Sequence, residues 1–210
     1  MKTESKNTEA ARKRYDRIAP VYDLMEGLVE RSRYSQWRKL LWDKVEGQKI
    51  LEVGVGTGKN FPYYPAHAEI TANDFSEKML RRARQKAVEH GVKVDLRQMD
   101  VQNLSFEDDT FDTVVATFVF CSVPDPILGL KEVKRVCTPD GKVLLLEHVL
   151  SANRMLAFLM NLANPIVVRT MGPNINRRTV ENAARGGLEV ERVTDLAAEI
   201  FKLIEARARK

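Results

Sequence analysis

Short apolar runs recur between residues 49 and 150, each followed by a longer segment in which polar residues interrupt the apolar ones. Runs of this length, bounded by Gly, Pro, Asp or Ser, are typical of strands buried in a sheet. Five strands are predicted in this way: KILEVGVG (49–56), AEITAND (68–74), KVDLRQMD (93–100), FDTVVATFVF (111–120) and GKVLLLEHVL (141–150).

Two of the intervening segments carry apolar residues at helical spacing. In residues 76–91, Ser76 stands at the N-cap position and Gly91 at the position where a helix ends. Residues 124–141 repeat this arrangement and close with a Pro-Asp-Gly turn. Strands that alternate with helices predict an α/β fold, in which a parallel sheet is covered by helices on both faces.

Three segments lie outside this alternation. Residues 8–45 look helical, with a break near Pro20, and residues 151–178 form an apolar insert punctuated by Asn and Pro. Residues 187–196 and 200–209 are both strand-like and close together, which predicts a terminal antiparallel hairpin.

These patterns divide the chain into two parts. Residues 1–45 are predicted to form a helical lid and membrane-docking segment, and residues 46–210 the sheet domain with its insert. In the first part Trp37, Leu41 and Trp42 lie beside Arg and Lys residues, the composition of a helix that lies on an anionic surface. Buried amphipathic helices have a similar composition, so both interpretations stay open.

The first predicted strand runs into three glycines within five positions, Gly54, Gly56 and Gly58. In open α/β sheets the turn after the first strand is the usual cradle for a ligand. A dinucleotide fingerprint places its third glycine one residue later than Gly58, so this spacing disfavours NAD.

Carboxylates follow the next two strands. Asp74 ends the second strand, where its oxygens can accept hydrogen bonds from both ribose hydroxyls of a nucleoside. Asp100 ends the third, where it can accept from an adenine amino group while Val101 packs on the ring. Each carboxylate alone could be a helix cap. Their order along the chain predicts an adenosine site without a phosphate.

Charge and cysteine content narrow the class of protein only slightly. The chain has 34 Lys and Arg against 29 Asp and Glu, a net charge of +5 that is compatible with an anionic membrane surface and also with ordinary variation. Cys121 and Cys137 have no paired Cys or His nearby, so neither a disulfide framework nor a metal site is expected. The N-terminus lacks the apolar core of a secretory signal and no segment reaches membrane-spanning length, so we expect a cytoplasmic protein, peripheral on the inner face of the membrane if it docks there.

Four stretches together resemble the class I S-adenosylmethionine-dependent methyltransferases: LEVGVGTG, TANDFSEKML, RQMDVQNLSFEDDTFDTVVATFVFCSVPDP and VKRVCTPDGKVLLLEHV. The resemblance implies a Rossmann-like, doubly wound sheet of seven strands, mostly parallel with an antiparallel last strand. It implies S-adenosylmethionine as cofactor, with Asp74 at the ribose and Asp100 and Val101 at the adenine. The implied cofactor-binding residues are Glu52, Gly54, Gly56, Gly58, Asp74, Phe75, Asp100 and Val101.

The segment YDRIAPVYD (15–23) resembles the lid of quinone-ring methyltransferases and bacterial phospholipid N-methyltransferases. This similarity makes Tyr15 and Tyr22 candidate catalytic residues and Asp23 a substrate-binding candidate, since an aromatic face stabilises a methylated ammonium. His148, at the end of the fifth strand, is the best-placed candidate base, although a structural histidine is at least as consistent with the pattern.

The acceptor is expected to be amphiphilic, because Leu156, Phe158, Leu159, Met160 and Leu162 of the insert supply more apolar surface than a small soluble substrate needs. We expect a phospholipid N-methyltransferase acting on phosphatidylethanolamine, with Arg31, Arg33, Arg177 and Arg178 as candidates for its phosphate.

Three alternatives remain open at this stage. The CSVPDP and LLLEHVLS stretches also resemble membrane-associated thiol methyltransferases, and the lid resembles quinone-ring C-methyltransferases. A non-enzymatic adenosine-binding module is the third. Nucleic-acid methylation is not expected, because the chain has no Asn/Asp-Pro-Pro-aromatic motif.

Overall fold

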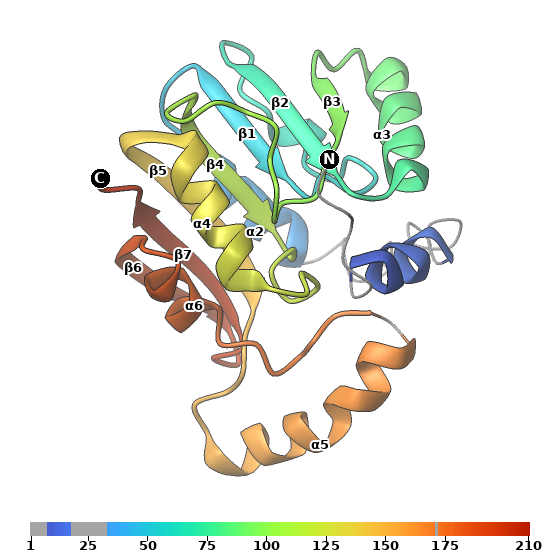
Figure 1. Cartoon of the computed structure of the whole chain (residues 1–210), viewed down its shortest axis with the longest axis vertical. Helices are drawn as coiled ribbons and strands as arrows, with labels where there is room; N and C mark the ends of the chain where they lie inside the picture. The colour runs from blue at the N-terminus through green and yellow to red at the C-terminus, as the bar shows by residue number, and fades with distance from the viewer. Residues whose placement is uncertain (1–7, 18–32, 171) are drawn as a thin grey trace.

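The computed structural model describes residues 8–17, 33–170 and 172–210. A seven-stranded sheet in the order β3-β2-β1-β4-β5-β7-β6 forms its centre (Figure 1). The strands are β1 (Lys49–Val53), β2 (Glu69–Asp74), β3 (Asp95–Gln98), β4 (Phe111–Thr117), β5 (Cys137–His148), β6 (Glu189–Ala197) and β7 (Phe201–Arg207).

The predicted sheet is confirmed. Strands β1 to β5 pair in parallel, while β7 runs antiparallel to both of its neighbours, β5 and β6. The terminal hairpin of β6 and β7 therefore forms one edge of the sheet. Its second strand, β7, lies between β5 and β6. Strand β1 ends at Val53, three residues before the predicted end, because Gly54 already has a φ of +69°.

The two helices predicted from apolar spacing are present. Helix α3 (Glu77–His90) starts at Ser76, whose hydroxyl accepts from the Met79 amide, and stops at Gly91 with a left-handed φ of +64°. Helix α4 (Pro126–Val136) is capped by the Asp125 side chain and ends five residues earlier than predicted, because β5 begins at Cys137. A short 3₁₀ turn, η2 (Phe61–Tyr63), and helix α6 (Thr179–Arg185) were not predicted.

Helix α2 (Ser35–Trp42) packs against one face of the sheet. Its Trp37, Leu41 and Trp42 are buried among side chains that include Leu144 and Leu203. The opposite face carries the cluster formed with α4, including Leu130 and Val133. The interpretation of α2 as an interfacial helix is therefore wrong, because its apolar face is occupied by the core.

The predicted apolar insert contains helix α5 (Arg154–Thr170), which lies apart from the sheet (Figure 1). Met160 is the only residue of this helix that is buried. The other apolar side chains predicted to form a surface are exposed, among them Phe158 at 66% and Leu162 at 67%. The described helices of the chain include none with the length and apolar content needed to cross a bilayer.

Candidate functional site

The glycine loop after β1 combines close packing on one side with open space on the other. A Cβ added to Gly54 would lie 2.5 Å from the Val119 side chain, so this position excludes any larger residue. A Cβ on Gly56, where φ is +57°, would meet no atom of residues 8–17, 33–170 or 172–210 within 4 Å. The backbone at Gly56 is thus exposed to a space that a ligand can enter.

The carboxylate of Asp74 closes this loop. It accepts hydrogen bonds from the Gly56 amide at 3.0 Å and from the Ser76 amide at 2.8 Å. Burial raises its pKa to about 6, although the two backbone donors act in the opposite direction. Asp74 therefore ties the loop after β1 to the start of α3 at the carboxyl edge of the sheet.

Asp100 lies two residues beyond β3 and accepts from both the backbone and the side chain of Gln102, at 2.9 and 2.8 Å. The Gln102 side chain also donates to the hydroxyl of Thr8, at 3.1 Å. Val101 is buried beside it, with 7% of its surface exposed. The turn after β3 is thereby held in place next to the helix over residues 8–17, which we call the N-terminal helix.

One cavity unites most of the predicted cofactor-binding residues with Tyr15. It is lined by seven of them: Tyr15, Gly54, Gly56, Asp74, Phe75, Asp100 and Val101. Sequence reasoning missed the rest of its wall, which is formed by Thr8, Asn73, Met79, Met99, Thr117, Phe118, Val119, Ser122, Val123 and Pro124. Thr117 ends β4 and residues 118–124 follow it, so the rule that ligands bind beyond strand ends could have indicated them.

Glu52 and Gly58 do not line this cavity. The Glu52 carboxylate is buried behind the loop, where it accepts from the Asn60 amide at 2.7 Å and from the Tyr64 hydroxyl. The Arg38 guanidinium donates to the side-chain oxygen of Asn60, Oδ1, at 3.0 Å. Burial raises the pKa of Glu52 to about 6. In this structure Glu52 supports the loop from behind.

The helix over residues 8–17 lies across the cavity. The Tyr15 ring packs edge-on against Phe75, with 5.7 Å between centroids, and its hydroxyl is hydrogen-bonded to the Ser122 hydroxyl. The Ser76 hydroxyl donates to Asp16 at 2.5 Å. Together with the bond from Gln102 to Thr8, these contacts attach the helix to the ends of β2, β3 and β4.

The remaining candidates are dispersed. Tyr22, Asp23 and Arg31 lie outside the described residues, and Arg33 is exposed just before α2. The Arg177 guanidinium donates to the Val123 carbonyl at 2.8 Å, close to the cavity wall. Arg178 is exposed and paired with Glu181 at 3.1 Å.

His148 is half-buried and does not line the cavity. Its ring packs edge-on against Phe201, with centroids 5.1 Å apart. Its Nδ1 is buried without a hydrogen-bond partner among the residues that the structure describes, and burial lowers the pKa of the imidazole. A role as base stays a prediction.

Glu147, which the sequence analysis passed over in favour of its neighbour, is fully buried at the end of β5. One of its carboxylate oxygens accepts from the amides of Val119 at 2.8 Å and Phe120 at 2.9 Å. Burial raises its pKa to about 7. Glu147 thereby fixes the turn after β4, which begins at Phe118 with a φ of +57° and supplies Ser122 to the cavity.

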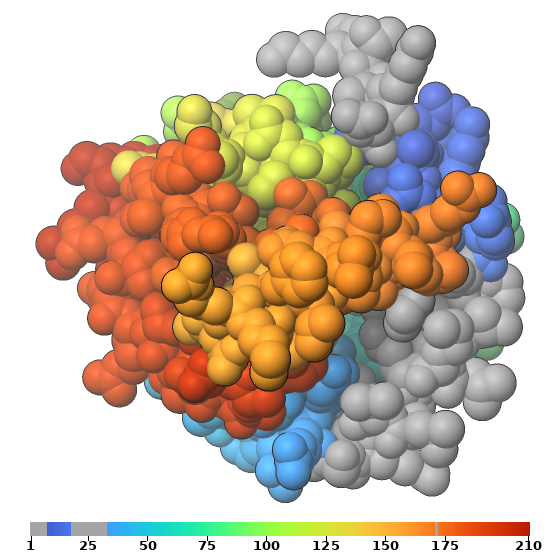
Figure 2. All heavy atoms as spheres, turned by 90° about the horizontal axis from the view of Figure 1, so that it is seen from below, coloured from blue at the N-terminus to red at the C-terminus, as the bar shows by residue number. Residues whose placement is uncertain are grey.

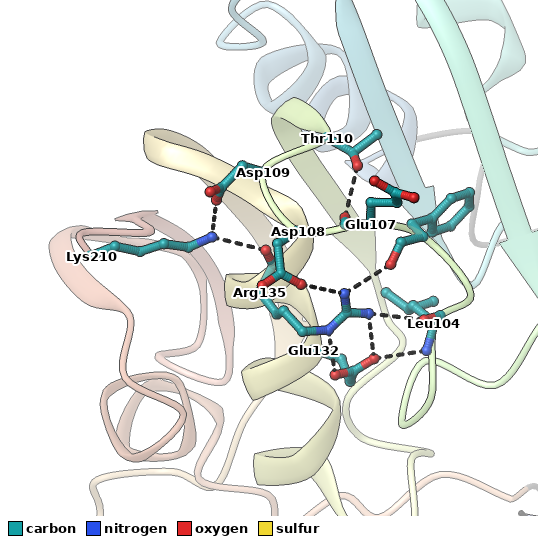
Figure 3. A network of polar contacts seen from close by, with 9 residues as sticks. Leu104, Glu107, Asp108, Asp109, Thr110, Glu132, Arg135 and Lys210 are labelled. Carbon is teal, nitrogen blue, oxygen red and sulfur yellow. Dashed lines mark hydrogen bonds and ion pairs between the residues drawn. The ribbon is translucent and has the colours of Figure 1, made fainter.

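A polar network braces the loop that follows Asp100 and Val101 (Figure 3). The Arg135 guanidinium donates to the carbonyls of Leu104 at 2.9 Å and Phe106 at 2.8 Å, and pairs with Asp108 at 2.8 Å. Glu132 completes it by accepting from Arg135 and from the Leu104 amide. Helix α4 is thus connected to the loop on the adenine side of the predicted cofactor site.

Known proteins are similar to this chain in sequence and in fold. Residues 51–145 match the methyltransferase domain family. A phosphatidylethanolamine N-methyltransferase of Cereibacter sphaeroides is 42% identical over 67% of this chain and 68% of its own. A ubiquinone/menaquinone biosynthesis C-methyltransferase of Bdellovibrio bacteriovorus is 33% identical over 70% of this chain, and the match spans 65% of that relative's length.

A solved structure of an S-adenosylmethionine-dependent methyltransferase from Thermotoga maritima shares the fold, with a TM-score of 0.70 over 94% of this chain and 99% of that one, at 21% identity. Three observations indicate the same family. They are the order of the strands, the glycine loop with Asp74 and Asp100 at one edge of the sheet, and the similarity in sequence. The chain belongs to the class I S-adenosylmethionine-dependent methyltransferases, and it is an enzyme that uses this cofactor.

Proposed function

We propose that this methyltransferase transfers methyl groups to the amine head group of phosphatidylethanolamine while docked on a membrane surface. The observation that carries the proposal is helix α5, an apolar helix that is exposed along most of its length. Its Val168 carbonyl accepts a hydrogen bond from Arg14 of the helix over residues 8–17, next to Tyr15 of the cavity. The similarity to a phosphatidylethanolamine N-methyltransferase supports the identity of the acceptor.

The exposed side of α5 has the composition of a membrane-docking surface. We call this surface the α5 face; it consists of Met155, Leu156, Phe158, Leu159, Leu162 and Ile166. Arg154 and Arg169 stand near its two ends, where they can meet lipid phosphates. Figure 2 shows α5 extending over the surface of the molecule, with one end beside the helix over residues 8–17.

The residues that line the cavity suit the chemical groups of S-adenosylmethionine. Asp74 and Asp100 supply carboxylate oxygens for hydroxyl and amino groups, Val101 supplies an apolar contact, and the open backbone at Gly56 admits close approach. The cofactor supplies an electrophilic methyl group on a sulfonium. The head-group ammonium loses a proton to solvent, and its nitrogen lone pair then takes the methyl group as the C–S bond breaks and S-adenosylhomocysteine leaves. The protein has chiefly to position the acceptor and exclude water from the transfer.

The residues on the acceptor side are suited to an amine. The hydroxyls of Tyr15 and Ser122 meet on the cavity wall and can accept hydrogen bonds from amine N–H groups. The Tyr15 ring offers an aromatic face to a methylated ammonium. We therefore keep Tyr15 as the leading candidate for positioning the amine.

A second acceptor class has specific support. Several relatives with 30 to 36% identity are named quinone or menaquinone methyltransferases, although this chain spans only 53 to 65% of their lengths. A quinone precursor is also amphiphilic, so it is compatible with the α5 face. A thiol acceptor remains the third candidate.

The test is methyl transfer from labelled S-adenosylmethionine, run in parallel with phosphatidylethanolamine vesicles, a demethylated quinone and an alkyl thiol, with products identified by mass. Mono-, di- or trimethylated lipid is the expected product. Label on the quinone or the thiol, with none on the lipid, would overturn the proposal and leave the cofactor site unaffected.

A further inference from the structure

A groove between the N-terminal helix and α5 gathers arginines from two distant parts of the chain. Arg14 and Arg17 come from the helix over residues 8–17, and Arg169 from the last turn of α5. The other residues that line it are Asn164, Pro165, Val168 and Asn174. We call this the arginine groove.

Within the part of the chain that the structure describes, little negative charge compensates the arginines of the groove. None of its lining residues is acidic. Arg14 donates to the Val168 carbonyl at 3.3 Å, which ties the two helices together. Arg17 and Arg169 are exposed and have no carboxylate partner in residues 8–17, 33–170 and 172–210. The nearest acidic residue in sequence, Asp16, is engaged by the Ser76 hydroxyl and pairs with Arg12 at 3.7 Å.

The groove adjoins both the cavity and the α5 face. The backbone and side chain of Asn174 donate to the Cys121 carbonyl at 2.8 and 3.1 Å, and Ser122 next to it lines the cavity. Arg14 directly precedes Tyr15, which lines the cavity from the other side. Val168 and Arg169 continue the helix that carries the α5 face.

We propose that the arginine groove binds the phosphodiester of the lipid acceptor, an inference that rests on the proposed function. Arginine is the side chain best suited to phosphate oxygens, because its planar guanidinium donates two parallel hydrogen bonds. A phosphate in the groove directs the attached amine to the cavity and the acyl chains to the α5 face. The arginines that contact the phosphate are then Arg17 and Arg169, rather than the four suggested by the sequence.

The experiment compares the wild-type enzyme with R17Q/R169Q, which removes two charges and preserves the bond from Arg14 to Val168. Steady-state methylation of dihexanoyl phosphatidylethanolamine, dissolved below its micelle concentration, removes the effect of membrane docking. We expect KM for this lipid to rise roughly tenfold with kcat little changed, the size of effect that two exposed charge pairs give together.

The matched control is R81Q/R192Q, which removes the same charge from exposed positions on α3 and β6. It is expected to keep the wild-type KM. The dissociation constant for S-adenosylhomocysteine is measured for all three proteins, so that a folding defect is recognised. An unchanged KM in R17Q/R169Q would overturn the phosphate site while the proposed function stands.

A second measurement separates the two proposals. Dihexanoyl phosphatidylglycerol has the same phosphodiester but no amine, so its binding does not depend on methyl transfer. If the wild-type enzyme fails to methylate phosphatidylethanolamine, loss of phosphatidylglycerol binding in R17Q/R169Q still supports the groove as a phosphodiester site. Binding equal to wild type, or complete competition by inorganic phosphate at the same concentration, would overturn a lipid-specific site.

Discussion

At the scale of single residues, buried carboxylates hold the loops that form the cavity. Asp74 and Glu147 are each buried and accept two backbone amides, and burial raises the pKa of both. Asp74 holds the loop after β1 and the turn after β2, and Glu147 holds the turn after β4. Their charge therefore affects the shape of the cavity as well as the stability of the fold.

Replacing Asp74 by Asn should weaken binding of S-adenosylmethionine by roughly 10- to 100-fold. Each carboxylate oxygen accepts one backbone amide, so the substitution removes one of these acceptors and also the charge that the predicted ribose contact would use. Isothermal titration calorimetry measures the effect. Glu69→Gln, at the exposed start of the same strand, is the matched control. Wild-type affinity in Asp74→Asn would remove this residue from the cofactor site.

Glu147 predicts a pH dependence of stability. Its pKa is about 7 in the folded protein and near 4.5 in the unfolded chain, so the folded state retains a proton that the unfolded state has lost. Unfolding between these pH values therefore releases a proton. Because of this release, the contribution of Glu147 to the free energy of unfolding falls as pH rises, by about 3 kcal/mol at most.

Urea denaturation at several pH values measures this for the wild type and for Glu147→Gln. Because Glu52 and Asp74 also have raised pKa values and stay in both proteins, the difference between the two curves isolates Glu147. The wild type should lose stability relative to the variant as pH rises from 4.5 to 7. A difference that stays constant, or rises, would contradict the assignment.

At the scale of elements, Arg135 connects α4 to the loop that follows Val101. Replacing it by Ala should lower the free energy of unfolding by about 1–3 kcal/mol, because two backbone carbonyls and two carboxylates lose their donor. Cofactor affinity should fall as well, since the same loop positions Asp100. Chemical denaturation and calorimetry measure the two effects. Lys131→Ala, exposed on the same helix, should change neither quantity.

The α5 face makes a separate prediction. Exchanging Phe158 and Leu162 for Ser should reduce binding to anionic vesicles at least tenfold, since each buries apolar area in the bilayer. The melting temperature should be unchanged, because both side chains are exposed. Vesicle co-sedimentation is the measurement. Val88→Ser, an exposed apolar position on α3, should leave vesicle binding intact; equal binding in all three proteins would refute docking through α5.

At the scale of the whole molecule, the sequence predicted the five parallel strands and the terminal hairpin, because periodicity, caps and glycines are local signals. Most of the cofactor-binding residues that it predicted at the ends of β1, β2 and β3 line one cavity, and their role in binding the cofactor stays a prediction. It failed where partners are distant in sequence. The pair of Tyr15 and Ser122, the support of the β4 turn by Glu147, and the contact of Arg14 with Val168 have no local signature.

What the sequence by itself determined is the sheet and the order of functional side chains along one edge, since parallel strands bring their carboxyl ends together. Only the tertiary structure decided which amphipathic segment faces outward. Helices α2 and α5 both combine apolar and basic residues, yet the tryptophans of α2 are buried in the core while the apolar side chains of α5 are exposed. The reason is physical: burial depends on what each helix packs against, and composition does not specify that partner.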